Sequence, residues 1–129
     1  MSGTDGPAGG VLTPERVHDT TREPVSGKDF VYCAICSTVI ARVADRIEVN
    51  GSFDHVCTNP HGVTFHLGCF GNALGCTISG DRMAADTWFP GFRWRIATCG
   101  ECSAHLGWYF DREETTYFYG LILNRIQYE

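Results

Sequence analysis

The pattern of apolar and polar residues along this chain favours β-strands, because short runs rich in β-branched and aromatic residues alternate with turn residues. We expect order to begin near Asp29, with the strand-like segment FVYCAICSTVIARV. Further strands are predicted for VTFHLGCF, WRIATC and HLGWYF, and the closing segment YFYGLILNRIQY favours a strand at its start. No helical stripe of convincing length interrupts this pattern, so we predict a mostly β protein.

Two short sequences predict tight turns. Asn50-Gly51 is typical of a type I′ hairpin turn between IEV and FDHV, because both residues accept positive φ angles. The sequence Asn59-Pro60-His61-Gly62, called the NPHG turn below, predicts a second turn. Residues 72–85 are small and irregular in pattern, and we assign no helix or strand to them.

Length and composition limit how the chain is organised. Its 129 residues suit one domain and leave no room for two independent cores. Residues 1–27 combine glycine, proline and polar residues without apolar periodicity. Such a segment buries too little surface to offset its ordering entropy. We therefore expect a disordered leader at 1–27 and one domain at 28–129.

Charge and hydropathy exclude two classes of function. The formal net charge of −5 argues against a nucleic-acid binder, which usually presents a basic face. No run of about 18 apolar residues is present, so we expect no membrane span. The N-terminus lacks the basic start and apolar stretch of a signal peptide, so we expect a cytoplasmic protein. In that reducing compartment, cysteine pairs are considered first as metal ligands.

Two C-x2-C pairs predict a metal site: Cys33 with Cys36, and Cys99 with Cys102. Such a pair, or knuckle, directs two thiolates at one metal, so two knuckles complete a tetrahedron. Two disulfides, a redox-active C-x2-C or plain buried thiols are the alternatives, and iron fits the same four sulfurs. We favour one structural zinc. Four thiolates leave no open position for catalysis, so its role would be in folding.

The other three cysteines, Cys57, Cys69 and Cys76, are interpreted as small buried hydrophobic residues. A catalytic thiol is the alternative, and it requires a nearby base. His61 and His66 are candidates for that base by sequence alone.

All three tryptophans, Trp88, Trp94 and Trp108, fall on either side of the second knuckle. Trp108 and Phe110 are two apart on a predicted strand, so they face the same side. The tryptophans form either part of the core or an aromatic cage. A tight hairpin at Pro90-Gly91 would place Trp88 and Trp94 on opposite faces, whereas a wider loop would let them converge.

A cage of three indoles would accept a flat or compact ring. The ring's polar groups would then need hydrogen bonds from the loop backbone near Asp86–Trp88. An alkylammonium ligand is the alternative occupant, through cation–π attraction assisted by Asp86.

The order of these motifs strongly resembles the thalidomide-binding (CULT) domain of the cereblon family. The resemblance rests on the first knuckle, the NPHG turn, TWFPGFRW, the second knuckle, SAHLGWYF and Phe118-Tyr119-Gly120-Leu121. It covers roughly residues 29–125, nearly all of the expected domain. It implies an antiparallel, zinc-stapled β-tent-like fold built from two small sheets.

The resemblance also implies roles for particular residues. The knuckle cysteines would bind a structural zinc away from the pocket. Trp88, Trp94 and Trp108 would form the walls of the cage and Phe110 its base, with Asn59 and Pro60 at the border. Backbone groups at Asp86 and Trp88 would bind the imide. The implied ligands are glutarimide and thalidomide-like cyclic imides, uridine-like compounds, or proteins ending in a C-terminal cyclic imide.

Two departures from the family pattern change what it implies. Asp86 stands where vertebrate members have a histidine, so the negative side chain is expected to alter ligand preference. The regions by which cereblon joins a ubiquitin ligase are absent from the sequence, so we expect a single-domain form, as in bacterial relatives, without a ligase-receptor role.

The favoured function is a non-enzymatic binding module, and two rival classes remain. An enzyme on the same scaffold would hydrolyse imides or pyrimidines, with Asp86 and His105 as candidate acid and base, or would resemble zinc-bearing sulfoxide reductases. Those reductases carry a nucleophilic cysteine after the second knuckle, and no cysteine follows Cys102. A nucleic-acid end binder is the other rival, which the acidic charge disfavours.

Overall fold

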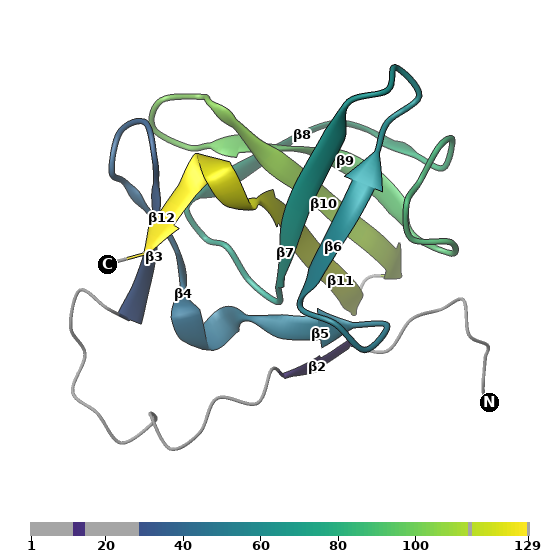
Figure 1. Ribbon diagram of the computed structural model, residues 1–129, viewed down its shortest axis with the longest axis horizontal. Coiled ribbons are helices and arrows are strands. Elements are labelled where there is room, and N and C mark those ends of the chain that lie inside the picture. The colour runs from purple at the N-terminus through teal and green to yellow at the C-terminus, as the bar shows by residue number, and fades with distance from the viewer. Residues whose placement is uncertain (1–11, 15–28, 114, 129) are drawn as a thin grey trace.

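The computed structural model describes residues 12–14, 29–113 and 115–128 (Figure 1). Nearly all regular structure in them is strand, and the prediction of a mostly β protein is confirmed. The elements are β2 (Leu12–Pro14), β3 (Phe30–Cys33), β4 (Val39–Arg42), η4 (Val43–Asp45), β5 (Ile47–Val49), β6 (Asp54–Thr58), β7 (Thr64–Phe70), β8 (Cys76–Met83), β9 (Arg93–Cys99), β10 (His105–Glu113), β11 (Thr116–Ile122), η5 (Leu123–Arg125) and β12 (Ile126–Tyr128), where η denotes a 3-10 helix.

These strands form two main antiparallel sheets, as predicted. The larger has the order β6-β7-β11-β10-β9-β8, and the smaller has the order β12-β3-β4. A third, two-stranded pairing joins β2 to β5 along the lower side of the molecule in Figure 1. Within the described ranges, no helix is long and apolar enough to cross a membrane.

The core lies between the two main sheets. Val31, Ile40 and Ala41 from the smaller sheet pack with Leu106 and Leu121 of the larger one, all of them buried. Burying an aliphatic side chain of this size stabilises the fold by about 1.5–3 kcal/mol. The close approach of β10 and β11 depends on Gly107, since a Cβ there would overlap the backbone carbonyl of Gly120.

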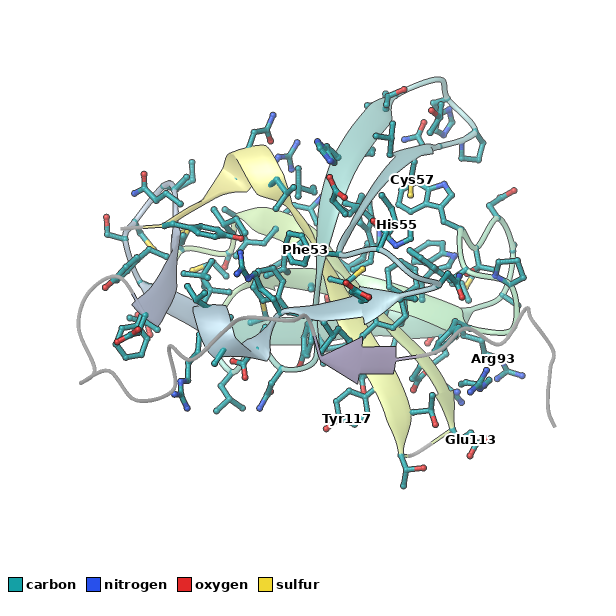
Figure 2. All side chains as sticks on the ribbon, turned by 60° about the horizontal axis from the view of Figure 1, so that its bottom comes forward. Phe53, His55, Cys57, Arg93, Glu113 and Tyr117 are labelled. Carbon is teal, nitrogen blue, oxygen red and sulfur yellow. The ribbon has the colours of Figure 1, made fainter. Side chains whose placement is uncertain are left out.

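The two predicted turns form. Asn50 and Gly51 have φ angles of 54° and 89°, the signs that a type I′ turn requires. The strands on either side of this turn do not form an extended hairpin. They are joined only by the bridge between Val49 and Ser52, because β6 pairs with β7 rather than with β5. Figure 2 shows His55 and Cys57 following each other along β6, with Arg93, Glu113 and Tyr117 on the lower side of the view.

Residues 72–85, to which no element was assigned from sequence, contain a strand, β8 (Cys76–Met83). This strand is the edge of the larger sheet and most of its residues are exposed, so it shows little apolar character. A register shift between Ser79 and Met83, with Gly80 at a φ of 88°, interrupts its alternation further.

Strand β2 lies within the segment that we expected to be a disordered leader. Residues 1–11 and 15–28 lie outside the described residues, so for them the leader stays a prediction.

Candidate functional site

The two knuckles are built alike, although one follows β3 and the other follows β9. In the first, the Cys33 amide donates to the carbonyl of Thr38 at 2.8 Å, and the Ser37 amide donates to that of Cys33 at 2.9 Å. In the second, Cys99 donates to Ala104 at 2.8 Å, and the amide of Ser103 donates back to Cys99 at 2.9 Å. Each hydrogen-bonded turn therefore presents its two cysteines in the same geometry.

The four knuckle sulfurs form one compact cluster. Their Sγ atoms all lie within 4.8 Å of one another. The distances between knuckles are 3.7 Å for Cys33 to Cys102 and 3.6 Å for Cys36 to Cys99. Zinc–sulfur bonds of about 2.3 Å at tetrahedral angles separate neighbouring sulfurs by about 3.8 Å. The cluster therefore has the dimensions of a four-thiolate metal site.

Hydrogen bonding at Cys36 favours its thiolate, the form that binds metals. Hydrogen bonding with Thr38, whose Oγ1 lies 3.1 Å from Sγ of Cys36, lowers the pKa of this thiol to about 6. The Glu101 amide also donates to Sγ of Cys99 at 3.4 Å. Four cysteines thus lie close together and could bind a metal ion.

A second feature is a pocket of about 480 Å³ on the face of the large sheet that carries Trp94 and Trp108. All seven residues that we predicted for ligand binding line this pocket. They are Asn59, Pro60, Asp86, Trp88, Trp94, Trp108 and Phe110. No described cysteine lines it, so the metal cluster and the pocket are separate sites.

Strand register places three of the aromatic walls on one face. Phe110 pairs with Trp94 across β10 and β9, and Trp108 pairs with Ile96. Directly opposed residues on neighbouring strands point to the same side of a sheet. Trp94, Trp108 and Phe110 therefore all face the pocket, and Phe110 is buried beneath it.

Trp88 reaches the same face because the connection between β8 and β9 is a wide loop. Met83, not residue 87, is the strand partner of Trp94, which leaves residues 84–92 free of pairing. The rings of Trp88 and Trp108 meet at 4.9 Å between centroids and 83° between planes. The structure therefore has the wide loop, and not the tight hairpin at Pro90-Gly91.

Backbone carbonyls fix the orientation of two indoles. Nε1 of Trp88 donates to the carbonyl of Thr58 at 3.0 Å, and Nε1 of Trp94 donates to that of Ala85 at 2.8 Å. These donors are therefore already satisfied, and the two indoles offer apolar faces rather than hydrogen bonds.

Buried phenylalanines hold the 84–92 loop in place. Phe89 contacts Phe110 and Phe118 at 4.8 and 5.0 Å between centroids, and Phe92 contacts Phe118 at 5.3 Å. The His55 ring packs edge-on against Phe89, while its Nε2 lies within hydrogen-bonding distance of the carbonyls of residues 49 and 52. The loop is thus part of the core on one side and the wall of the pocket on the other.

Asp86 occupies the exposed part of this loop with a φ of 59°. Aspartate is among the few residues that adopt this left-handed conformation at modest energy. Its carboxylate has no salt-bridge partner in the described part of the chain. The backbone amide of the neighbouring Trp88 likewise has no acceptor among the described residues.

Four further residues line the pocket that we did not assign to ligand binding from sequence: His61, Phe65, Ile96 and His105. Two of them, His61 and His105, were considered only as candidate catalytic groups. Phe65 packs against Trp108 at 5.1 Å and against Trp88 at 6.2 Å between centroids. Strand alternation could have indicated two of these residues, because Phe65 lies on the strand after the NPHG turn and Ile96 is two residues after Trp94 on β9.

His105 is on the pocket face because of a β-bulge. The register of β10 against β9 shifts between His105 and Gly107, which rotates His105 onto the face of Trp108. The two rings then meet edge to face at 4.8 Å. Nε2 of His105 lies 2.9 Å from the carbonyl of Gly107, and burial lowers the pKa of this imidazole.

The three remaining cysteines are not exposed, in agreement with their interpretation as small hydrophobic residues. Burial raises the pKa of Cys57 to about 11 and that of Cys76 to about 12, and it also raises that of Cys69. All three therefore stay protonated at neutral pH, which is unfavourable for a nucleophile.

The chain is similar to known proteins named cereblon. No family model matches the chain. It is 38% identical to Protein cereblon of Xenopus tropicalis over 52 residues, which is 40% of this chain. It is 31% identical to Protein cereblon of Drosophila persimilis over 98 residues, or 70% of the chain, and 28% identical to that of Drosophila virilis over 104 residues, or 77%. The matched segments span 12% to 16% of these relatives' lengths.

Proposed function

Because the chain belongs to the cereblon family through a cereblon-type domain, we propose that it is a binding module that holds a cyclic imide ring among Trp88, Trp94 and Trp108. The observation that carries this proposal is the convergence of three indoles from two strands and one loop on a single pocket. Their apolar faces surround a space suited to a compact ring.

The polar part of the ring would be bound by the loop backbone. The Trp88 amide is without an acceptor among the described residues and belongs to the pocket-lining loop. It is therefore the donor best suited to an imide carbonyl oxygen, and the backbone carbonyl of Asp86 is the matching acceptor for the imide N–H. Two complementary hydrogen bonds in an apolar site would distinguish an imide from a hydrocarbon ring of the same size.

Asn59 and Pro60 form the border of the pocket. Oδ1 of Asn59 accepts hydrogen bonds from the amides of His61 and Val63, both at 2.9 Å. The Asn59 side chain thus fixes the shape of the NPHG turn, and Pro60 is held at the rim. We assign these two residues to positioning the rim against the ligand.

The four-cysteine cluster would hold one structural zinc ion in this proposal. The sulfur spacing fits a tetrahedron of thiolates, and a complete set of four protein ligands leaves no position for a substrate. The ion would stabilise the turns after β3 and β9, and thereby join the two main sheets.

A binding role is favoured over catalysis by the same geometry. No described cysteine lines the pocket, which disfavours a sulfoxide-reductase mechanism. His105 lies within hydrogen-bonding distance of the Gly107 carbonyl through Nε2 and packs against Trp108, as expected for a wall residue. The natural ligand would be a free cyclic imide, a pyrimidine-like ring, or a cyclic imide at the C-terminus of another protein.

The decisive experiment is a titration of the zinc-loaded protein with glutarimide, followed by tryptophan fluorescence. N-methylglutarimide serves as a control ligand, since it lacks the imide N–H. We expect saturable quenching with glutarimide only, and loss of binding by at least tenfold in Trp94→Ala. The exposed Tyr117→Ala, on β11, is the matched control and should bind normally. Normal glutarimide affinity in a folded Trp94→Ala variant would refute the cage.

A further inference from the structure

A fifth cysteine lies beside the four-cysteine cluster. Cys76 is the first residue of β8 and the strand partner of Cys99, the last residue of β9. These two strands are neighbours at the edge of the larger sheet (Figure 1). Cys76 also packs against the core cluster that contains Cys33 and Cys99.

Hydrogen bonding shows which kind of strand pair this is. The amide of Gly100 donates to the carbonyl of Gly75 at 2.8 Å. A bond between the residues flanking a pair identifies Cys76 and Cys99 as a non-hydrogen-bonded antiparallel pair. In such pairs the Cα atoms are about 4.5 Å apart and both side chains point to the same side.

That spacing is suitable for a disulfide. Bridged cysteines have Cα atoms about 4.4–6.8 Å apart, so the backbone needs no rearrangement here. The other two non-ligand cysteines lack such a partner. Cys57 is opposite Phe65 and Cys69 is opposite Gly120.

We propose that Cys76 and Cys99 form a cross-strand disulfide when a peroxide oxidises the four-cysteine site, and that this disulfide keeps the ends of β8 and β9 joined once the metal is lost. The inference concerns a site separate from the aromatic pocket and does not depend on imide binding.

The reaction begins where the cluster is accessible. Cys36 is exposed, whereas Cys99 is 1% exposed. The Cys36 thiolate attacks hydrogen peroxide, the O–O bond breaks, and the products are a sulfenic acid and hydroxide. The Cys99 thiolate, 3.6 Å away, then attacks the Cys36 sulfur and displaces a second hydroxide, forming a Cys36–Cys99 disulfide.

Thiol–disulfide exchange completes the sequence. Hydroxide released in the preceding steps removes the proton from Cys76 and becomes water. The Cys76 thiolate then attacks the Cys99 sulfur, an S–S bond forms between them, and Cys36 leaves as a thiolate. Overall, one peroxide takes two electrons from Cys76 and Cys99 and becomes one hydroxide ion and one water molecule, which carries the Cys76 proton. Cys99 is then no longer a metal ligand, and the metal is released.

Peptide mapping tests the proposal on the full chain loaded with zinc. The protein is treated with hydrogen peroxide, alkylated and digested without reduction. Chymotrypsin cleavage after Phe70 separates Cys76 from Cys57 and Cys69, and cleavage after Glu101 by a second, glutamate-specific protease separates Cys99 from Cys102. We expect a peptide pair linked through Cys76 and Cys99, appearing with zinc release, and recovery of the zinc-binding form after reduction.

Variants separate the proposed role from general oxidation damage. Cys76→Ala should lose the linked peptide and should unfold or aggregate as zinc leaves, while Cys57→Ala, the matched control, should behave as wild type. Oxidised wild type with disulfides only among the four ligands, or with Cys76 alkylated, overturns the proposal. The peptide map of the oxidised wild-type protein tests the proposal even if Cys76→Ala fails to fold.

Discussion

Ser37 and Ser103 occupy equivalent positions in the two knuckles, each directly after the second cysteine, with φ angles of 66° and 65°. Each amide donates to the carbonyl of the first cysteine of its knuckle at 2.9 Å. Both serines therefore adopt the left-handed conformation that closes the turn around the sulfur cluster. This conformation costs a residue with a Cβ about 1–2 kcal/mol relative to the right-handed form, and glycine adopts it without that strain.

Glycine at either serine should therefore stabilise the domain. We expect Ser103→Gly to raise the free energy of unfolding by up to about 1 kcal/mol, and Ser103→Val to lower it, because a β-branched side chain fits this conformation poorly. Urea unfolding of the zinc-loaded protein measures both changes. Ser79→Gly, within strand β8, is the control and should destabilise. A lower stability for Ser103→Gly than for wild type would contradict the strain argument.

Removal of the metal should unfold much of the domain. Metal binding by such a cluster contributes directly to folding free energy, because the ligand geometry does not exist in the unfolded chain. We expect one zinc per chain by mass spectrometry, and loss of near-UV circular dichroism when a strong chelator is added. Cys99→Ser should behave like the chelated protein. The matched variant Cys57→Ser replaces a buried cysteine outside the cluster and should keep its zinc.

The features that sequence could predict are those encoded by local spacing. Each knuckle is contained in six residues, so C-x2-C indicates its sulfur geometry without knowledge of the rest of the fold. The type I′ turn at Asn50-Gly51 is equally local. The shared face of Trp108 and Phe110 follows from strand alternation over two residues.

The features whose position could not be predicted from sequence depend on irregularities of the strands and on long-range packing. His105 is three residues before Trp108, so regular alternation would place it on the other face, and only the bulge reverses this. Strand β8 was missed because an exposed edge strand needs few apolar residues. The convergence of Trp88 with Trp108 depends on the path of the 84–92 loop, which long-range packing of Phe89 and Phe92 determines.

The charge of Asp86 should influence which ligands bind. Asp86 is exposed and lines the pocket. Two unit charges that are exposed to solvent and a few ångströms apart interact with an energy of about 1 kcal/mol. We expect a glutarimide carrying a trimethylammonium group to bind several-fold more tightly than its neutral tert-butyl analogue at low salt.

This preference should disappear in Asp86→Asn and weaken in high salt, because screening reduces the interaction of exposed charges. Asp81→Asn, on the exposed part of β8, is the control and should keep the preference. An unchanged preference in Asp86→Asn would show that the carboxylate does not face the bound ligand.

His105 should make the stability of the domain depend on pH. Burial lowers the pKa of this imidazole, and the nearby Arg125, which donates to the His105 backbone carbonyl at 2.9 Å, adds to the effect. Below the ordinary histidine pKa of about 6.5 the unfolded chain binds a proton that the folded domain resists. Stability is therefore fully present above that pH and is lost as the pH falls toward the folded-state pKa.

His105→Gln, which keeps a hydrogen-bond donor without a titrating ring, should lose less stability between pH 7 and about 5.5, measured by urea unfolding. Because acid also weakens the metal site in both proteins, only the difference between their profiles reports on His105. The exposed His61→Gln is the matched control, and its profile should follow wild type. Parallel profiles for His105→Gln and wild type would mean that the folded domain accommodates a protonated ring beside Trp108.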